Sequence, residues 1–198
     1  MKSLLDFIAK PESGGNYNIV WGGIRKQHRP TRPLVEMTIG QVLAWQDSID
    51  PFYMSEAAGK YQIMEDTLRG LYSQAGMDLN DLFDEQGQDR LAIQLLKRRG
   101  LRAYQRGEIS TETFANNLAH EWASLPMVTG PKKGRSVYAG DGLNKSHVSV
   151  SDFMAAVRTI KTAAPVSQPP VDHVPVIAAP SFWSGIVKAI TQFFQRKT

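Results

Sequence analysis

Glu12 is the carboxylate whose surroundings best suit acid chemistry. It stands in the segment KPESGG, directly after an apolar stretch and before Gly14 and Gly15. Glycines let a ligand approach the backbone closely, and a packed helix before them can fix the acid at the floor of a cleft. Partial burial there raises the pKa of a carboxyl group, as a general acid at neutral pH requires. A solvated glutamate at a helix end is the plain alternative.

The second unusual segment is AAGKYQIM, residues 57–64. Tyr61 supplies a flat ring, which can stack on the face of a pyranose. Gln62 supplies a neutral amide, which can bond to hydroxyl or acetamido groups, so the pair suits a sugar as ligand. The same residues also fit the edge of a strand with an ordinary core tyrosine, and the pair alone leaves both interpretations open.

Periodic apolar residues predict several helices around these two segments. The first covers residues 4–10 and should end at Pro11 and the glycine pair. Thr38 is the expected N-cap of a second helix, and residues 66–74 predict a third that closes at Gly76. Longer helices are expected from Asp84 to about Tyr104, from Ser110 or Thr111 through Trp122 to a stop at Pro126, and from a cap at Ser151 onward.

The remaining stretches favour irregular structure. Residues 16–23, NYNIVWGG, are rich in β-formers and predict a short strand or turn. Residues 25–36 are expected to form an exposed loop, and residues 127–147 a glycine- and lysine-rich loop. The predicted fold class is therefore mainly α, a helical α+β domain with a small β element.

The composition changes near residue 164. Five of the eleven prolines lie between residues 165 and 180, which predicts a semi-rigid linker at 164–180. Residues 181–198 place aromatic and aliphatic side chains on one stripe with cations beside it, which predicts a basic amphipathic helix. Such a helix can contact a membrane surface or dock on protein. The expected folded domain is 1–163.

The overall composition narrows the class of protein. The chain has 198 residues, of which 42% are hydrophobic and 21% charged, as is typical of a globular domain with an extension. It has no cysteine, which excludes disulfides, thiolate zinc sites and a cysteine nucleophile. The formal net charge of +4 favours polyanionic partners such as nucleic acid, anionic membrane or cell envelope. We predict no signal peptide and no transmembrane helix.

The sequence resembles the phage lambda-type endolysins, which are lytic transglycosylases with a lysozyme-like fold. The matching segments are LLDFIAKPESGG at 4–15, AAGKYQIM at 57–64, LAIQLLKRRGLRAYQRGEI at 91–109 and EWASLP at 121–126, with GRSVYAGDG at 134–142 as a weaker fifth. The resemblance implies a lysozyme-like domain with a substrate cleft and Glu12 as its catalytic residue. It also implies that Ser13, Tyr61 and Gln62 bind substrate beside Glu12, and that Tyr138 stacks on a sugar.

The resemblance further implies a mechanism with one acid. Glu12 would protonate the glycosidic oxygen between N-acetylmuramic acid and N-acetylglucosamine. It would then accept the proton of the muramic C6 hydroxyl, so that a 1,6-anhydro sugar forms. No metal or cofactor takes part, the substrate is the glycan strand of peptidoglycan, and a monomer is expected. The protein would be made in the host bacterial cytoplasm and act on the cell wall in the periplasm, at lysis or from the virion.

Three other functions stay open at this stage. A hydrolytic muramidase needs a second carboxylate, for which the candidates are Glu36, Asp47, Asp50 and Glu56. An inactive module would keep the fold and only bind cell wall or membrane. A nucleic-acid binder would use the basic run Lys97, Arg98, Arg99, Arg102 and Arg106. Such a run is more often a solvated helix face, so no nucleic-acid partner is expected.

Overall fold

Helices dominate the structure, a computed structural model that describes residues 1–140 and 145–161. The α-helices are α1 (Lys2–Ser13), α2 (Ile39–Ile49), α3 (Glu65–Leu71), α4 (Glu85–Arg98), α5 (Leu101–Gln105), α6 (Thr111–Ala119) and α7 (Val150–Lys161). The 3-10 turns are η1 (Lys26–His28), η2 (Leu34–Glu36), η3 (Asp50–Phe52) and η4 (Ser73–Ala75). Within this part of the chain the β structure consists of isolated bridges. The mainly helical fold is thus confirmed, while the lysozyme-like detail stays a prediction.

α1 extends further than its sequence indicates. Its buried face carries Leu4, Leu5 and Ile8, as the apolar spacing predicts. Pro11 does not end the helix. It lies in the last turn, where its missing N–H removes only one backbone hydrogen bond, and its ring fixes φ near the helical value. The helix ends at Gly14, which has φ 64° and donates its N–H to the Lys10 carbonyl at 3.1 Å. Residue 12 therefore belongs to the final turn of a packed helix.

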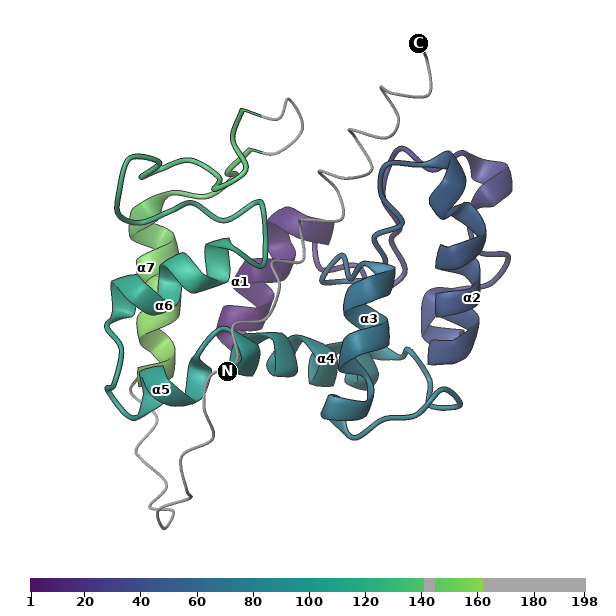
Figure 1. Cartoon of the computed structure of the whole chain (residues 1–198), viewed down its shortest axis with the longest axis horizontal. Helices are drawn as coiled ribbons and strands as arrows, with labels where there is room; N and C mark the ends of the chain where they lie inside the picture. The colour runs from purple at the N-terminus through teal and green to yellow at the C-terminus, as the bar shows by residue number, and fades with distance from the viewer. Residues whose placement is uncertain (141–144, 162–198) are drawn as a thin grey trace. The chain divides into compact units, whose positions relative to one another are not determined.

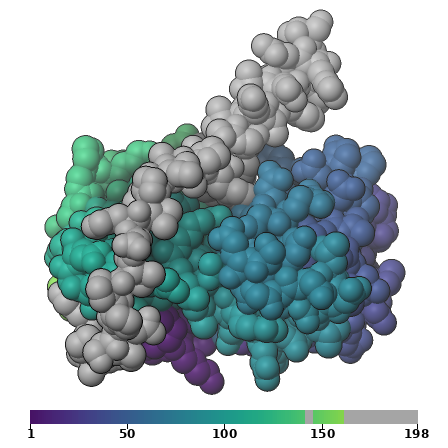
Figure 2. Space-filling view, turned by 60° about the horizontal axis from the view of Figure 1, so that its bottom comes forward, coloured from purple at the N-terminus to yellow at the C-terminus, as the bar shows by residue number. Residues whose placement is uncertain are grey.

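The helices pack in two groups that α4 connects (Figure 1). In the first group α7 contacts α1, α5 and α6, and in the second α2 packs on α3. α4 contacts α1 and α5 as well as α3. In the space-filling view, the blue atoms of the α2–α3 region and the teal to green atoms of later helices lie on opposite sides of the visible face (Figure 2).

The small β element is a tight turn at residues 58–63. Ala58 forms antiparallel bridges with Val20 and with Ile63. Gly59 has φ 75°, and a Cβ on it would lie 2.2 Å from Oε1 of Gln88. Glycine is therefore required at this position, both for the left-handed backbone and for the close approach of α4.

Three predicted boundaries are wrong. Gly100, with φ 100°, divides the expected helix at 84–104 into α4 and α5. α6 ends at Ala119, because Trp122 continues the apolar spacing but is buried from the turns that follow the helix. The Oγ of Ser149, rather than that of Ser151, accepts the hydrogen bond from the Asp152 N–H at 3.1 Å and caps α7.

Other local predictions agree with the structure. Thr38 forms a capping box with Gln41 at the start of α2, and Gly76 closes η4 with φ 69°. The expected loop at 25–36 is mainly exposed, although it contains η1 and η2 and buries Leu34. The predicted linker 164–180 and terminal helix 181–198 lie outside the described residues. Among the helices that are described, none is long and apolar enough to cross a membrane.

Candidate active site

Glu12 lies half-buried in the last turn of α1, where Ser124 donates a hydrogen bond of 2.5 Å from Oγ to its Oε1. Burial raises the pKa of the Glu12 carboxyl above its ordinary value of 4.5. Hydrogen bonds from the side chain and main chain of Ser124 lower the pKa in part, as does the nearby charge of His147. The result is a carboxyl group suited to hold a proton and to release it to a substrate.

Ser124 reaches Glu12 from a turn that the fold holds at several points. Trp122 is buried and donates from Nε1 to the carbonyl of Tyr61 at 3.3 Å. The His147 N–H bonds to the Ser124 carbonyl at 2.9 Å. Sequence reasoning noticed the EWASLP segment but gave Ser124 no role, because nothing local shows which residue its hydroxyl meets.

The turn that carries Ser124 begins near Glu121, whose ion pairs hold it against the end of α4. Its carboxylate accepts bonds from Arg98 at 2.8 Å and Arg99 at 2.6 Å, and its side chain is 6% exposed. Arg106 is paired with Glu108 at 2.5 Å. Three cations of the basic run are therefore paired with carboxylates within the protein.

Ser13 is a buried positioning residue in this structure. Its Oγ donates to the Lys60 carbonyl at 2.7 Å or the Ala9 carbonyl at 3.1 Å, and accepts from the Gly15 N–H at 3.1 Å. These bonds tie the end of α1 to the 57–64 segment. The predicted contact of Ser13 with substrate is not what the side chain shows, because its hydroxyl is already engaged.

Tyr61 is a core residue, 1% exposed, so its ring cannot present a face to a sugar in this structure. Its hydroxyl donates to Oδ1 of Asp89 at 2.6 Å. Burial and the Asp89 carboxylate raise the pKa of the Tyr61 phenol. The interpretation as a core tyrosine is therefore the better one, and Tyr61 contributes through its carbonyl, which receives the Trp122 hydrogen bond.

Lys60 joins α1, the 57–64 segment and α4, a role that sequence reasoning missed. Its side chain is 7% exposed, and its Nζ lies 2.9 Å from Asp6 and 3.8 Å from Asp89. Nζ also donates to the Tyr17 hydroxyl at 3.0 Å, and the Lys60 N–H bonds to Gln88 at 2.8 Å. A buried cation requires such partners, so this cluster fixes the backbone that receives Ser13.

Gln62 differs from its neighbours because its backbone is left-handed and its side chain is half-buried. It is the non-glycine residue with positive φ in the described chain, at 50°. Its Nε2 donates to the Gly59 carbonyl at 2.9 Å, which leaves Oε1 without a hydrogen-bond donor among the described residues. Strained backbone of this kind is found at functional sites, and Gln62 stays a predicted substrate-binding residue.

Tyr138 is half-buried, and its hydroxyl donates to the His120 carbonyl at 2.9 Å. This bond places Tyr138 against the start of the turn that carries Ser124. The expected stacking of its ring on a sugar is not tested by these contacts and stays a prediction, as does a cleft along Glu12.

A sequence model of the endolysin family matches residues 8–151, a span that includes Glu12, Gln62, Ser124 and Tyr138. The chain belongs to the endolysin family. It is therefore a phage enzyme that degrades peptidoglycan. No curated protein and no solved structure matches this endolysin.

The four candidates for a second carboxylate lie in different settings in this endolysin. Glu36, Asp47 and Asp50 are exposed. Glu56 is buried, which raises the pKa of its carboxyl, and its Oε1 accepts from the Glu65 N–H at 3.1 Å at the start of α3. Glu56 thus satisfies the N-terminus of a helix, and none of the four forms a hydrogen bond with Glu12 or Ser124.

Proposed function

We propose that this endolysin is a lytic transglycosylase that cleaves the β-1,4 bond between N-acetylmuramic acid and N-acetylglucosamine. The observation that carries the proposal is a half-buried Glu12 with a raised pKa and Ser124 as its hydrogen-bond donor. A carboxyl group of this kind serves as a general acid near neutral pH. The proposed substrate-binding residues beside it are Gln62 and Tyr138.

The reaction needs both protonation states of Glu12. The protonated carboxyl gives its proton to the glycosidic oxygen as the bond to C1 of the muramic residue breaks. The carboxylate then accepts the proton of the C6 hydroxyl, whose oxygen bonds to C1 and closes the 1,6-anhydro ring. The Ser124 hydroxyl stabilises the intermediate carboxylate, because it donates to Oε1. No water is consumed, so no second carboxylate is required to activate one.

A hydrolytic muramidase is the alternative, and Glu56 is the observation in its favour. Glu56 is the buried member of the four candidate acids and its pKa is raised. Its engagement with the N-terminus of α3 speaks for a structural role. In two-carboxylate glycosidases both acids flank the bond that is cleaved, and the hydrogen bonds of Glu56 and Glu12 go to different elements.

Mass analysis of the muropeptides released from purified cell walls distinguishes the two reactions. Transglycosylation gives products lighter by one water than hydrolysis, and reducing ends do not form. Glu12→Gln should lower the rate roughly 10²–10⁴-fold, as expected for loss of a general acid. Asp47→Asn, a matched loss of an exposed acid, should leave the rate unchanged. Full activity of Glu12→Gln, or reducing-end products, would contradict the proposal.

A further inference from the structure

Residues 13–35 carry no acidic side chain, although four cations lie among them: Arg25, Lys26, Arg29 and Arg32. All four are exposed, and none forms an ion pair within residues 1–140 and 145–161. This contrasts with Arg98 and Arg99, which Glu121 neutralises. The loop before α2 therefore presents uncompensated positive charge, which favours an anionic partner.

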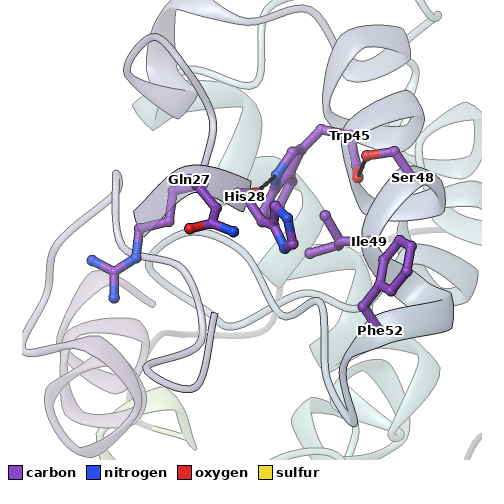
Figure 3. A pocket seen from close by; sticks show the side chains of 7 residues that line it. Gln27, His28, Trp45, Ser48, Ile49 and Phe52 are labelled. Atoms are coloured by element: carbon purple, nitrogen blue, oxygen red, sulfur yellow. Dashed lines mark hydrogen bonds between the residues drawn. The ribbon is translucent and has the colours of Figure 1, made fainter. Parts of the chain in front are cut away.

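Two hollows lie against this loop, and Arg29 borders both. The first has a volume of about 250 Å³ and is shown in Figure 3. Gln27 and His28 come from the loop side, and Trp45 comes from α2. Trp45 donates to the His28 carbonyl at 2.8 Å, and the His28 ring is bonded to the Tyr53 hydroxyl at 2.7 Å. These bonds hold a wall of mixed character, to which Ile49 and the exposed Phe52 add apolar surface.

The second hollow, of about 280 Å³, is more polar. Asn16, Asn18, Arg29 and Arg32 line it together with apolar residues. The side-chain oxygen of Asn16 accepts from the Asn18 N–H at 2.8 Å, and that of Asn18 accepts from the Val35 N–H at 3.1 Å. The amide NH₂ groups have no acceptor in the described chain, and neither do the terminal nitrogens of the arginines. The available groups are donors, so the hollow suits a ligand with acceptor oxygens.

The second hollow lies close to Glu12 along the chain. Asn16 is four residues beyond Glu12, so their Cα atoms are at most about 14 Å apart. A glycan held at Glu12 carries peptide stems on its muramic residues, and those stems hold the free carboxylates of peptidoglycan. Their small aliphatic side chains suit the surface of Trp45, Ile49 and Phe52 in the first hollow, and their carboxylates suit the donors of the second.

We propose that the two hollows beside Arg29 bind a peptide stem of peptidoglycan, with Arg29 and Arg32 on its carboxylates. This inference rests on the proposed function for its choice of substrate. Asp47 and Asp50 flank Ser48 and Ile49 in the chain but line neither hollow and form no ion pair with the arginines. The stem site would select strands whose peptides are intact.

The test measures binding of the full chain carrying Glu12→Gln, which keeps the cell wall undigested. One substrate is peptidoglycan with intact stems, and the other is glycan from which an amidase has removed the stems. Adding Arg29→Gln and Arg32→Gln should weaken binding to intact peptidoglycan about tenfold and leave binding to stripped glycan unchanged. Lys97→Gln with Arg102→Gln is the matched control, since both residues are exposed and without ion pairs in the described chain.

Binding to anionic phospholipid vesicles is measured in parallel. Three results would overturn the proposal: no loss of binding to intact peptidoglycan, equal loss on both glycan substrates, or a loss confined to the vesicles. The last would make a membrane the partner. Because Arg29 donates to the Ile24 carbonyl at 3.0 Å, its replacement can disturb the loop. Arg32→Gln alone avoids that bond and should still weaken binding to intact peptidoglycan about threefold. Failure of the proposed function appears separately, as wall lysis by the Glu12→Gln chain.

Discussion

Removal of the Ser124 hydroxyl is expected to move the pH dependence of cell-wall lysis. In the native protein Ser124 donates to Glu12 at 2.5 Å and so favours the charged carboxylate. Ser124→Ala deletes that donor, while burial continues to favour the neutral acid. The pKa of Glu12 therefore rises further, and the acid stays protonated to higher pH. The alkaline limb of the activity profile should therefore move to higher pH.

The size of the displacement follows from the strength of the lost bond. Hydrogen bonds to a charged group contribute about 1.5–3 kcal/mol, and one pH unit corresponds to about 1.4 kcal/mol. Ser124 is buried, so water replaces its hydroxyl poorly. The main-chain hydrogen bond from Ser124 remains in the variant. We therefore expect an upward displacement of about one to two pH units.

The assay is the initial rate of turbidity loss of permeabilised cells between pH 5 and 10, at cell-wall concentrations below saturation. Under that condition the profile reports the pKa of the free enzyme's acid. Ser73→Ala, which removes an exposed hydroxyl in η4, should leave the profile unchanged. An alkaline limb that stays in place, or moves to lower pH, would refute the assignment of Ser124 as the donor that tunes Glu12.

The remaining predictions concern stability and the tail. Because its folded pKa is raised, Glu12 favours the folded state below its unfolded pKa of 4.5, and that contribution is lost as pH rises through the folded pKa. Glu12→Gln should therefore raise the melting temperature more at pH 8 than at pH 4, and an equal gain at both would contradict this. Gly59→Ala should lower the free energy of unfolding in urea by about 2–4 kcal/mol, because its Cβ meets the buried Gln88. Gly70→Ala is its control, since a Cβ there meets nothing within 4 Å. Deletion from Pro165 should leave activity on isolated cell walls intact, and loss of that activity would assign the tail to the folded domain.

Much of the helical framework follows from local sequence signals. Thr38 with Gln41 forms the predicted cap, and the apolar spacing of α1 places Leu4, Leu5 and Ile8 in the core. These features depend on residues within one or two turns of each other, so their physical basis is contained in a short segment. The predictions were wrong where contacts between distant segments decide the structure. Trp122, for example, packs in the core from a turn that follows the end of α6.

The sequence also singled out Glu12 and the 57–64 segment as neighbours in function, and Glu12 is a half-buried acid as expected. The hydrogen-bond partner of Glu12 could not be predicted from the sequence, because Ser124 is 112 residues away in the chain. The same limit applies to Tyr61, whose ring could face a ligand or the core until the Asp89 contact assigned it to the core. Spacing fixes which residues share a helix face, whereas hydrogen bonds between distant segments depend on packing of the whole domain.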